Sequence, residues 1–214
     1  MKKLLTTLSV ALMTLMANAQ ASDNETLTFL GIPIDGSKTE MIRQLEGKGF
    51  KYERMLDLLT GKINGEESFV FIQEHEGKVY RVDVSDTEVF TKEQVIIRYN
   101  NLLSQFKQDS RYGELEEYLP IPEEEDISYE MRIHKKVYAA VFCLIRDLSE
   151  EEMEAIAAKA KGIEDENELA SYLAKAFIEG TIPGRIWFEI KENKGEYWIQ
   201  IYFENRRNRP REED

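Results

Sequence analysis

Apolar residues recur at the spacing of one helical face in four stretches of the chain. Each stretch comes directly after residues that typically cap the N-terminus of a helix. The most regular is 92–108, which follows a T-x-x-Q capping pattern at Thr91. A short stretch follows the S-x-x-E pattern at Ser37 and ends at two closely spaced glycines. The stretches 149–161 and 165–180 begin at a serine and an aspartate that suit helix N-termini. The sequence therefore predicts one long helix, one short helix and two consecutive helices.

Alternating apolar and polar residues predict a first β-hairpin. It pairs 68–73 with 78–84 around a Glu-Gly turn. On its second strand, Val79, Arg81 and Asp83 share one face. Because two of these residues are charged, we expect that face of the hairpin to meet water.

A second hairpin is predicted near the end of the chain, where 185–191 pairs with 196–204. The stretch 138–145 is apolar on both faces, as in a strand covered on both sides in the middle of a sheet. The stretch 50–63 is ambiguous between strands and a helical turn. Within it, Gly61 is interpreted as a turn signal.

These elements predict an α+β protein, with antiparallel sheet meanders and helices packed on one side. Pro120 lies in an acidic stretch without periodicity, which is the best boundary between two similar halves, as one domain or two. The predicted division is a signal peptide 1–19, an N-terminal α+β half 20–119, a C-terminal α+β half 120–204 and a disordered charged tail 205–214.

The N-terminus has the three parts of a secretory signal peptide. Lys2 and Lys3 precede the apolar stretch 4–16, and the small residues Ala17 and Ala19 form a cleavage site. The other interpretation is an apolar first helix of the mature domain. No cysteine follows the cleavage site, so no lipid anchor is predicted. We expect a protein exported to the periplasm or the extracellular space and cleaved near Ala19.

Charge and cysteine content narrow the possible partners. The formal net charge is −13, and removal of Lys2 and Lys3, the only charged residues before residue 20, makes it −15. A strongly acidic protein repels nucleic acid and anionic lipid, but it accepts a basic partner. No later stretch is long and apolar enough to span a bilayer. Cys143 is the only cysteine, so no internal disulfide is possible, and its apolar neighbours predict a buried, inert thiol.

The sequence contains no pattern of a known catalytic or metal site. His75 and His134 are the only histidines, and neither has another histidine or a cysteine at ligand spacing. The acidic runs 123–126 and 164–168 lack the alternating oxygen ligands of a calcium loop. We therefore expect no metal, no cofactor and no recognisable catalytic residue. With 41 acidic residues, a pair of neighbouring carboxylates stays open as a catalytic alternative.

The sharpest chemical feature lies on the second hairpin. Trp187, Trp198 and Tyr202 share its less aliphatic face with glutamate, lysine and glutamine side chains. Aromatic rings among polar groups suit stacking on a sugar or anchoring a protein partner. Two plainer interpretations also fit, and the sequence favours them: the chain's own helices cover this face, or the aromatics form ordinary cross-strand pairs. These three residues are the candidate ligand-binding surface.

Motifs of the first half occur in the same order in a known family. They are FLGIPIDGSKTEMIRQLEGKGF, LLTGKINGEESFVFIQEHEGKVYRVDV and a long helix ending near Tyr112-Gly113. Over about 29–113 the chain resembles small exported proteins of uncharacterised function from gut Bacteroidetes. It is more weakly similar to β-lactamase-inhibitor-like proteins and to small lipoproteins of outer-membrane assembly. The similarity implies protein binding without catalysis. The chain departs from these two groups because it lacks both paired cysteines and a lipidated cysteine.

These observations together predict an exported, non-catalytic binding or interaction protein of the cell envelope, with a protein or glycan partner. The alternative is an envelope hydrolase that uses an unrecognised carboxylate pair. A deep pocket with two facing carboxylates would favour the enzyme. A flat sheet face that exposes the three aromatic residues would favour the binding protein.

Overall fold

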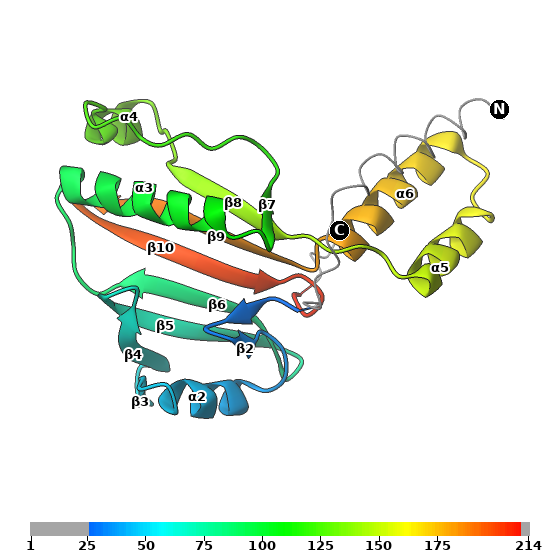
Figure 1. Cartoon of the computed structure of the whole chain (residues 1–214), viewed down its shortest axis with the longest axis horizontal. Helices are drawn as coiled ribbons and strands as arrows, with labels where there is room; N and C mark the ends of the chain where they lie inside the picture. The colour runs from blue at the N-terminus through cyan, green and yellow to red at the C-terminus, as the bar shows by residue number, and fades with distance from the viewer. Residues whose placement is uncertain (1–25, 211–214) are drawn as a thin grey trace. The chain divides into compact units, whose positions relative to one another are not determined.

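The computed structural model describes residues 26–210 and shows two compact units (Figure 1). One unit contains Thr26–Leu144 together with the chain from Pro183 onward. The second contains Ile145–Ile182. The predicted signal peptide, 1–19, lies outside the described residues.

The first unit is built on an antiparallel sheet of eight strands, in the order β3-β4-β5-β6-β10-β9-β8-β7, together with a separate two-stranded hairpin β1-β2. With the helices described below, this sheet confirms the predicted α+β class. The strands are β1 Thr28–Phe29, β2 Ile32–Pro33, β3 Lys51–Glu53, β4 Leu58–Ile63, β5 Glu66–His75, β6 Lys78–Asp86, β7 Tyr112–Glu114, β8 Ala139–Leu144, β9 Gly184–Asn193 and β10 Glu196–Asn205.

The order of elements in this unit occurs twice. Helix α2 (Lys38–Glu46) precedes β3 to β6, and α3 (Lys92–Gln108) precedes β7 to β10, with α4 (Ile127–Ile133) between β7 and β8. The last strands of the two sets, β6 and β10, pair antiparallel at the centre, where Ile201 lies opposite Val84. The predicted boundary at residue 120 falls between β7 and α4, and strands from both sides of it belong to this one sheet.

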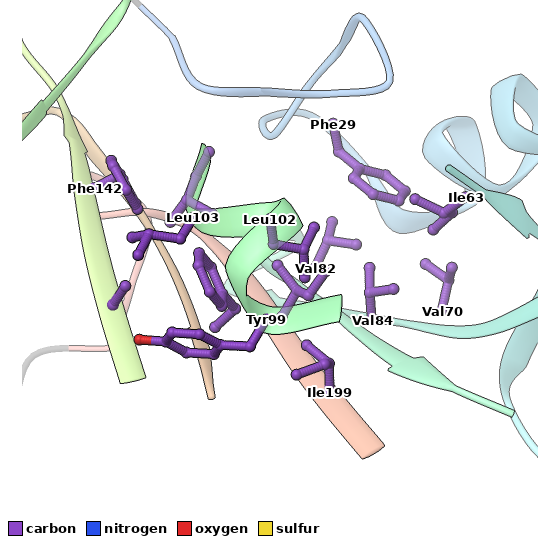
Figure 2. Packing of buried hydrophobic residues seen from close by; sticks show 14 of the residues in the cluster. Phe29, Ile63, Val70, Val82, Val84, Tyr99, Leu102, Leu103, Phe142 and Ile199 are labelled. Atoms are coloured by element: carbon purple, nitrogen blue, oxygen red, sulfur yellow. The ribbon is translucent and has the colours of Figure 1, made fainter. Parts of the chain in front are cut away.

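One face of the sheet forms the core with the helices. Tyr99 and Leu102 of α3 belong to the same buried apolar cluster as Val82 and Val84 of β6, which Figure 2 shows from close by. The buried side chains of α2, α3 and α4 belong to the same apolar cluster as the inward-facing strand residues. Tyr99 also packs edge-on against Phe188 of β9, with ring centroids 5.1 Å apart. Burial of this face is the main stabilising contribution to the unit.

Helix α2 begins where the sequence predicts, although its capping box is incomplete. The Ser37 hydroxyl accepts a hydrogen bond from the Glu40 amide at 3.3 Å. The Glu40 carboxylate binds Arg43 and Gln44 instead of reaching back to the cap. Helix α3 has the complete box, since Thr91 and Gln94 satisfy each other's backbone amides.

The Ser37 cap provides a first prediction. Ser37→Ala removes the acceptor for the Glu40 amide and is expected to lower the free energy of unfolding by about 1 kcal/mol. Urea titration followed by circular dichroism measures the change. Ser37→Asp keeps an acceptor at this position and serves as the control, with a midpoint near that of the unmodified chain. Equal midpoints for the alanine variant and the unmodified chain would show that the cap is not stabilising.

The second unit is a pair of helices, α5 (Glu150–Ala160) and α6 (Glu166–Thr181), as the sequence predicts. Ser149 caps α5 in a complete capping box, and the Asp165 carboxylate accepts two amides at the start of α6. At the base, the Arg146 amide donates to the Thr181 carbonyl at 2.9 Å. Within 26–210, no helix reaches the length and apolar character that crossing a bilayer requires.

The chain from Asn205 onward differs in part from the predicted disordered tail 205–214. Strand β10 runs to Asn205, whose side-chain amide donates to the Ile34 carbonyl at 2.7 Å. The Asn208 amide donates to the Val79 carbonyl at 3.1 Å. These two asparagines hold the first part of the tail against the sheet unit, and 211–214 lie outside the described residues.

Candidate functional site

The three predicted aromatic residues all lie on the side of the sheet opposite the core. Side chains alternate along β9 and β10, so Ile186 and Phe188 face the core while Trp187 faces away. Trp198 and Tyr202 lie on that same outer side. We call this side of the central strands the open face, because α2, α3 and α4 bury their apolar side chains against the other side. These three helices therefore do not cover the open face, and the plainer interpretation that the chain's own helices cover it stays a prediction.

Trp187 and Tyr202 form a stacked pair. They lie directly opposite each other on β9 and β10, with ring centroids 4.5 Å apart and planes 14° from parallel. The Arg185 guanidinium carbon lies 4.8 Å from the Trp187 ring centroid, and that of Arg81 lies 5.7 Å from the Tyr202 centroid. Both rings are thus engaged by neighbours, as in the second of the plainer interpretations, a cross-strand pair.

Trp198 lies apart from this pair. It is opposite Lys191, four positions before Tyr202 on β10, which corresponds to about 13 Å along a strand. Glu189 and Gln200 fill the row between them. No ring or guanidinium of the described residues stacks on Trp198. The structure therefore brings two of the three predicted residues together and places the third on the same face at a distance.

Charges on the open face are paired with one another. Arg81 contacts Asp83 at 2.7 Å, Arg185 contacts Glu204 at 2.8 Å, and Lys191 contacts Glu189 at 2.7 Å. These pairs couple adjacent strands or neighbouring positions of one strand. Because each cation has its own anion, the face presents aromatic rings in a nearly neutral surrounding, without a dominant sign of charge.

The pKa values of two groups on the open face are shifted. Burial raises the pKa of Asp83, although Arg81 acts against this shift. Burial also raises the pKa of Tyr202 to about 12, and the nearby charge of Glu189 adds to the effect. The Tyr202 hydroxyl donates to the Glu189 carboxylate at 3.2 Å. At neutral pH the tyrosine is therefore a hydrogen-bond donor that is held in place by its own neighbour.

Two acidic residues of the open face are relevant to the alternative function, a hydrolase that uses a pair of carboxylates. The charge of Glu204 contributes to the raised pKa of Asp83, which is the kind of coupling that a catalytic pair needs. Each of them, however, is already bound by an arginine, Asp83 by Arg81 and Glu204 by Arg185. Neither Asp83 nor Glu204 is therefore a carboxylate free of an arginine. The alternative of a hydrolase with a catalytic carboxylate pair stays a prediction.

Strands β5 and β6 add residues to the open face that sequence reasoning did not connect with the aromatics. Arg81 and Asp83 share the open face, and Asp83 lies directly opposite Tyr202. The prediction that this face meets water is wrong for Asp83, which is only 8 % exposed. Val79 does not share their face, because it is fully buried. A register shift between Gln73 and Glu74 in β5 changes the pairing at this point, so the alternation predicted from sequence is interrupted.

The remaining candidate residues are Cys143 and the two histidines, and each lies within or at the end of a strand or helix. Cys143 is a buried free thiol as predicted, and burial raises its pKa. His75 ends β5 beside the predicted turn. His134 ends α4, with its Nδ1 2.9 Å from Glu130. Across 26–210, no three histidine, cysteine or acidic side chains gather closely enough to hold a metal ion. The expected absence of a metal and of a cofactor stays a prediction.

An open hollow of about 490 Å³ lies where α3 and β10 begin, and its lining does not include Trp187, Trp198 or Tyr202. Phe90 and Tyr197 form part of its lining, and their backbones are bridged to each other. The Tyr197 hydroxyl is bonded to Ser128 at 2.5 Å. The cationic lining residues Lys92 and Arg132 are each paired with an acidic residue. Among the described lining residues, the hollow therefore offers no unpaired cation to a ligand.

Comparisons of this chain with models of protein families, with curated proteins and with solved structures gave no match.

Proposed function

We propose that this chain is an exported, non-catalytic binding protein of the cell envelope, and that the open face recognises a protein partner. The observation that carries the proposal is the group of Trp187, Tyr202, Arg81 and Arg185 on the outer side of the central strands. Tryptophan, tyrosine and arginine are the residues most enriched among those that dominate the energy of protein interfaces. The signal-peptide pattern at the N-terminus supports export.

The geometry of the Trp187–Tyr202 pair favours a protein over a glycan. A sugar stacks on the flat face of an aromatic ring, and the faces of Trp187 and Tyr202 already contact each other and two guanidinium groups. Protein interfaces, in contrast, use the edges and the packed surface of such clusters. Paired charges also suit an interface core, because no unpaired ion has to be desolvated on binding.

The position of the open face also supports recognition. Strands β9 and β10 pair along ten residues each, and β10 is bonded to β6 on its other side. Side chains on such strands are already ordered before a partner arrives. The loss of conformational entropy on binding is therefore smaller than for a surface built from loops.

A photo-crosslinking experiment in the exporting cell tests this proposal. A benzophenone amino acid is placed at Gln200, which lies between Trp198 and Tyr202 on the open face. The matched control carries it at Leu119, a surface residue that is 69 % exposed. We expect one discrete protein adduct from position 200 and none from position 119.

Trp198→Ala separates binding from folding in this experiment. Trp198 has no stacking partner among the described residues, so its loss should leave the melting temperature nearly unchanged while it removes the adduct. Trp187→Ala is less suitable, because it also breaks the stack with Tyr202. Identical adducts from positions 200 and 119, or an adduct unaffected by Trp198→Ala, would contradict the proposal. An adduct that disappears after deglycosylation would indicate a glycan instead.

A further inference from the structure

The helical unit Ile145–Ile182, called the helical hairpin below, interrupts two strands that are already neighbours. The last residue of β8, Leu144, lies directly opposite the first residue of β9, Gly184. Two antiparallel strands in this register need a connection of only about two to five residues. The sheet therefore does not require the two helices as a connection, so we expect another role for them.

The apolar side chains of the helical hairpin are at most partly buried. Helix α6 carries Leu169, Tyr172, Leu173 and Phe177 at the spacing of one helical face, yet Thr181 is its only buried residue. Helix α5 has no buried residue. Two helices can cover only the sides that face each other, and short helices are marginal in water unless they bury an apolar face. The outer part of this apolar stripe therefore remains available for a partner.

Both helices of the hairpin also carry exposed apolar side chains. Met153 of α5 is 40 % exposed and Ile178 of α6 is 44 % exposed. Around these residues the helical hairpin is acidic, because 145–182 contain ten aspartate and glutamate residues against four lysine and arginine residues. Several of the acids lie in the first turns of α5 and α6, where they also stabilise the helix N-termini.

We propose that the helical hairpin docks a basic amphipathic helix of another protein. An apolar stripe with an acidic border matches a helix that has apolar residues on one face and lysine or arginine beside them. A second copy of this chain is the less favourable occupant, because it would place one acidic border against another. The occupant is thus defined by its chemistry: helical, apolar on one face and cationic at the margins. The proposal rests on residues of the helical hairpin alone.

A pair of synthetic peptides tests the proposal. The probe is a fluorescein-labelled peptide of about 18 residues, roughly five helical turns, with leucine on one helical face and lysine elsewhere. The comparison peptide has the same composition in a scrambled order that forms no apolar face. In about 0.15 M salt, where long-range charge attraction is screened, fluorescence anisotropy should show at least tenfold tighter binding of the amphipathic peptide.

Two variants assign the binding to the helical hairpin. The double substitution Glu151→Lys and Glu154→Lys changes two exposed acids of α5 that are not part of its capping box, and it should weaken binding about tenfold. The control, Glu123→Lys with Glu124→Lys, makes the same charge change on exposed residues of the sheet unit and should leave binding unchanged. Phe177→Ser should weaken binding without changing the net charge, and circular dichroism reports whether its helices remain.

Three outcomes would overturn the proposal. Equal affinity for the scrambled peptide would show attraction by charge alone. Equal weakening by the control substitutions would place the binding elsewhere on the acidic surface. A dimer in solution that Phe177→Ser dissociates would identify a second copy of the chain as the occupant. None of these outcomes bears on crosslinking from Gln200, so failure here is distinguishable from failure of the proposed function.

Discussion

Asp86→Ala is expected to lower the free energy of unfolding by about 3–5 kcal/mol, because it leaves a buried arginine without its counter-ion. The Asp86 side chain is only 2 % exposed and that of Arg98 only 13 %. Arg98 Nε donates to Asp86 at 2.8 Å, and a second guanidinium nitrogen binds the other carboxylate oxygen. The same carboxylate accepts the backbone amide of Ile199 at 3.0 Å.

Asp86 therefore joins three elements by one carboxylate: β6, which carries it, α3, which carries Arg98, and β10, which carries Ile199. Guanidinium chloride titration measures the loss of stability. The informative control is the double replacement Asp86→Leu with Arg98→Met, which removes both charges and should recover most of the loss. A single alanine variant as stable as the unmodified chain would show that the pair is not effectively buried.

Phe188→Ala is the second substitution with a large expected effect. We expect it to lower the free energy of unfolding by about 3–5 kcal/mol, because it leaves a cavity and removes apolar contacts. Phe188 has no exposed surface and lies at the centre of an aromatic cluster. Its ring centroid lies 5.1 Å from that of Tyr99, 5.7 Å from that of Phe106 and 6.2 Å from that of Phe142. The substitution thus removes the common contact of α3, β8 and β9.

Phe69→Ala is the matched control for Phe188→Ala. It makes the same chemical change on β5, at a partly buried position that lies on the open face in register with Ser85. We expect Phe69→Ala to lower the free energy of unfolding by less than half as much as Phe188→Ala does, as measured by denaturant titration of both variants. Equal losses would mean that the open face is as tightly packed as the core, which would argue against its availability to a partner.

Helix starts were predictable from sequence because caps are local. Ser37, Thr91 and Ser149 were chosen from the residues that follow them within one turn, and each is an N-cap in the structure. The faces of the last hairpin were also predictable, since alternation along one strand needs no information about the rest of the fold. This local information placed Trp187 and Tyr202 correctly on one face.

The pairing of distant strands was not predictable in this way. The open face depends on the contact between β6 and β10, which places Asp83 opposite Tyr202 although they are far apart in the chain. Nothing within either hairpin encodes that contact, so the sequence predicts only that Arg81 and Asp83 meet water. The partners of Asn205 and Asn208 were missed for the same reason, because charge composition does not show which carbonyl a distant amide will find.

Gly61 shows how a local signal can have a non-local cause. It was interpreted as a turn residue, whereas it lies within β4. A Cβ atom at this position would lie 2.5 Å from the ring of Phe50, which is itself nearly buried. The glycine is thus required by a side chain that packs over the strand, and the sequence shows the glycine without showing the ring above it.

The sheet ends on both sides in strands of only three residues, β3 and β7. Long, flat edge strands expose unpaired amides and carbonyls that recruit further chains into fibres, and very short edge strands are one way in which proteins avoid this. A chain with a broad aromatic sheet surface is at particular risk of such self-association at high local concentration. The short edge strands β3 and β7 therefore provide protection against such self-association.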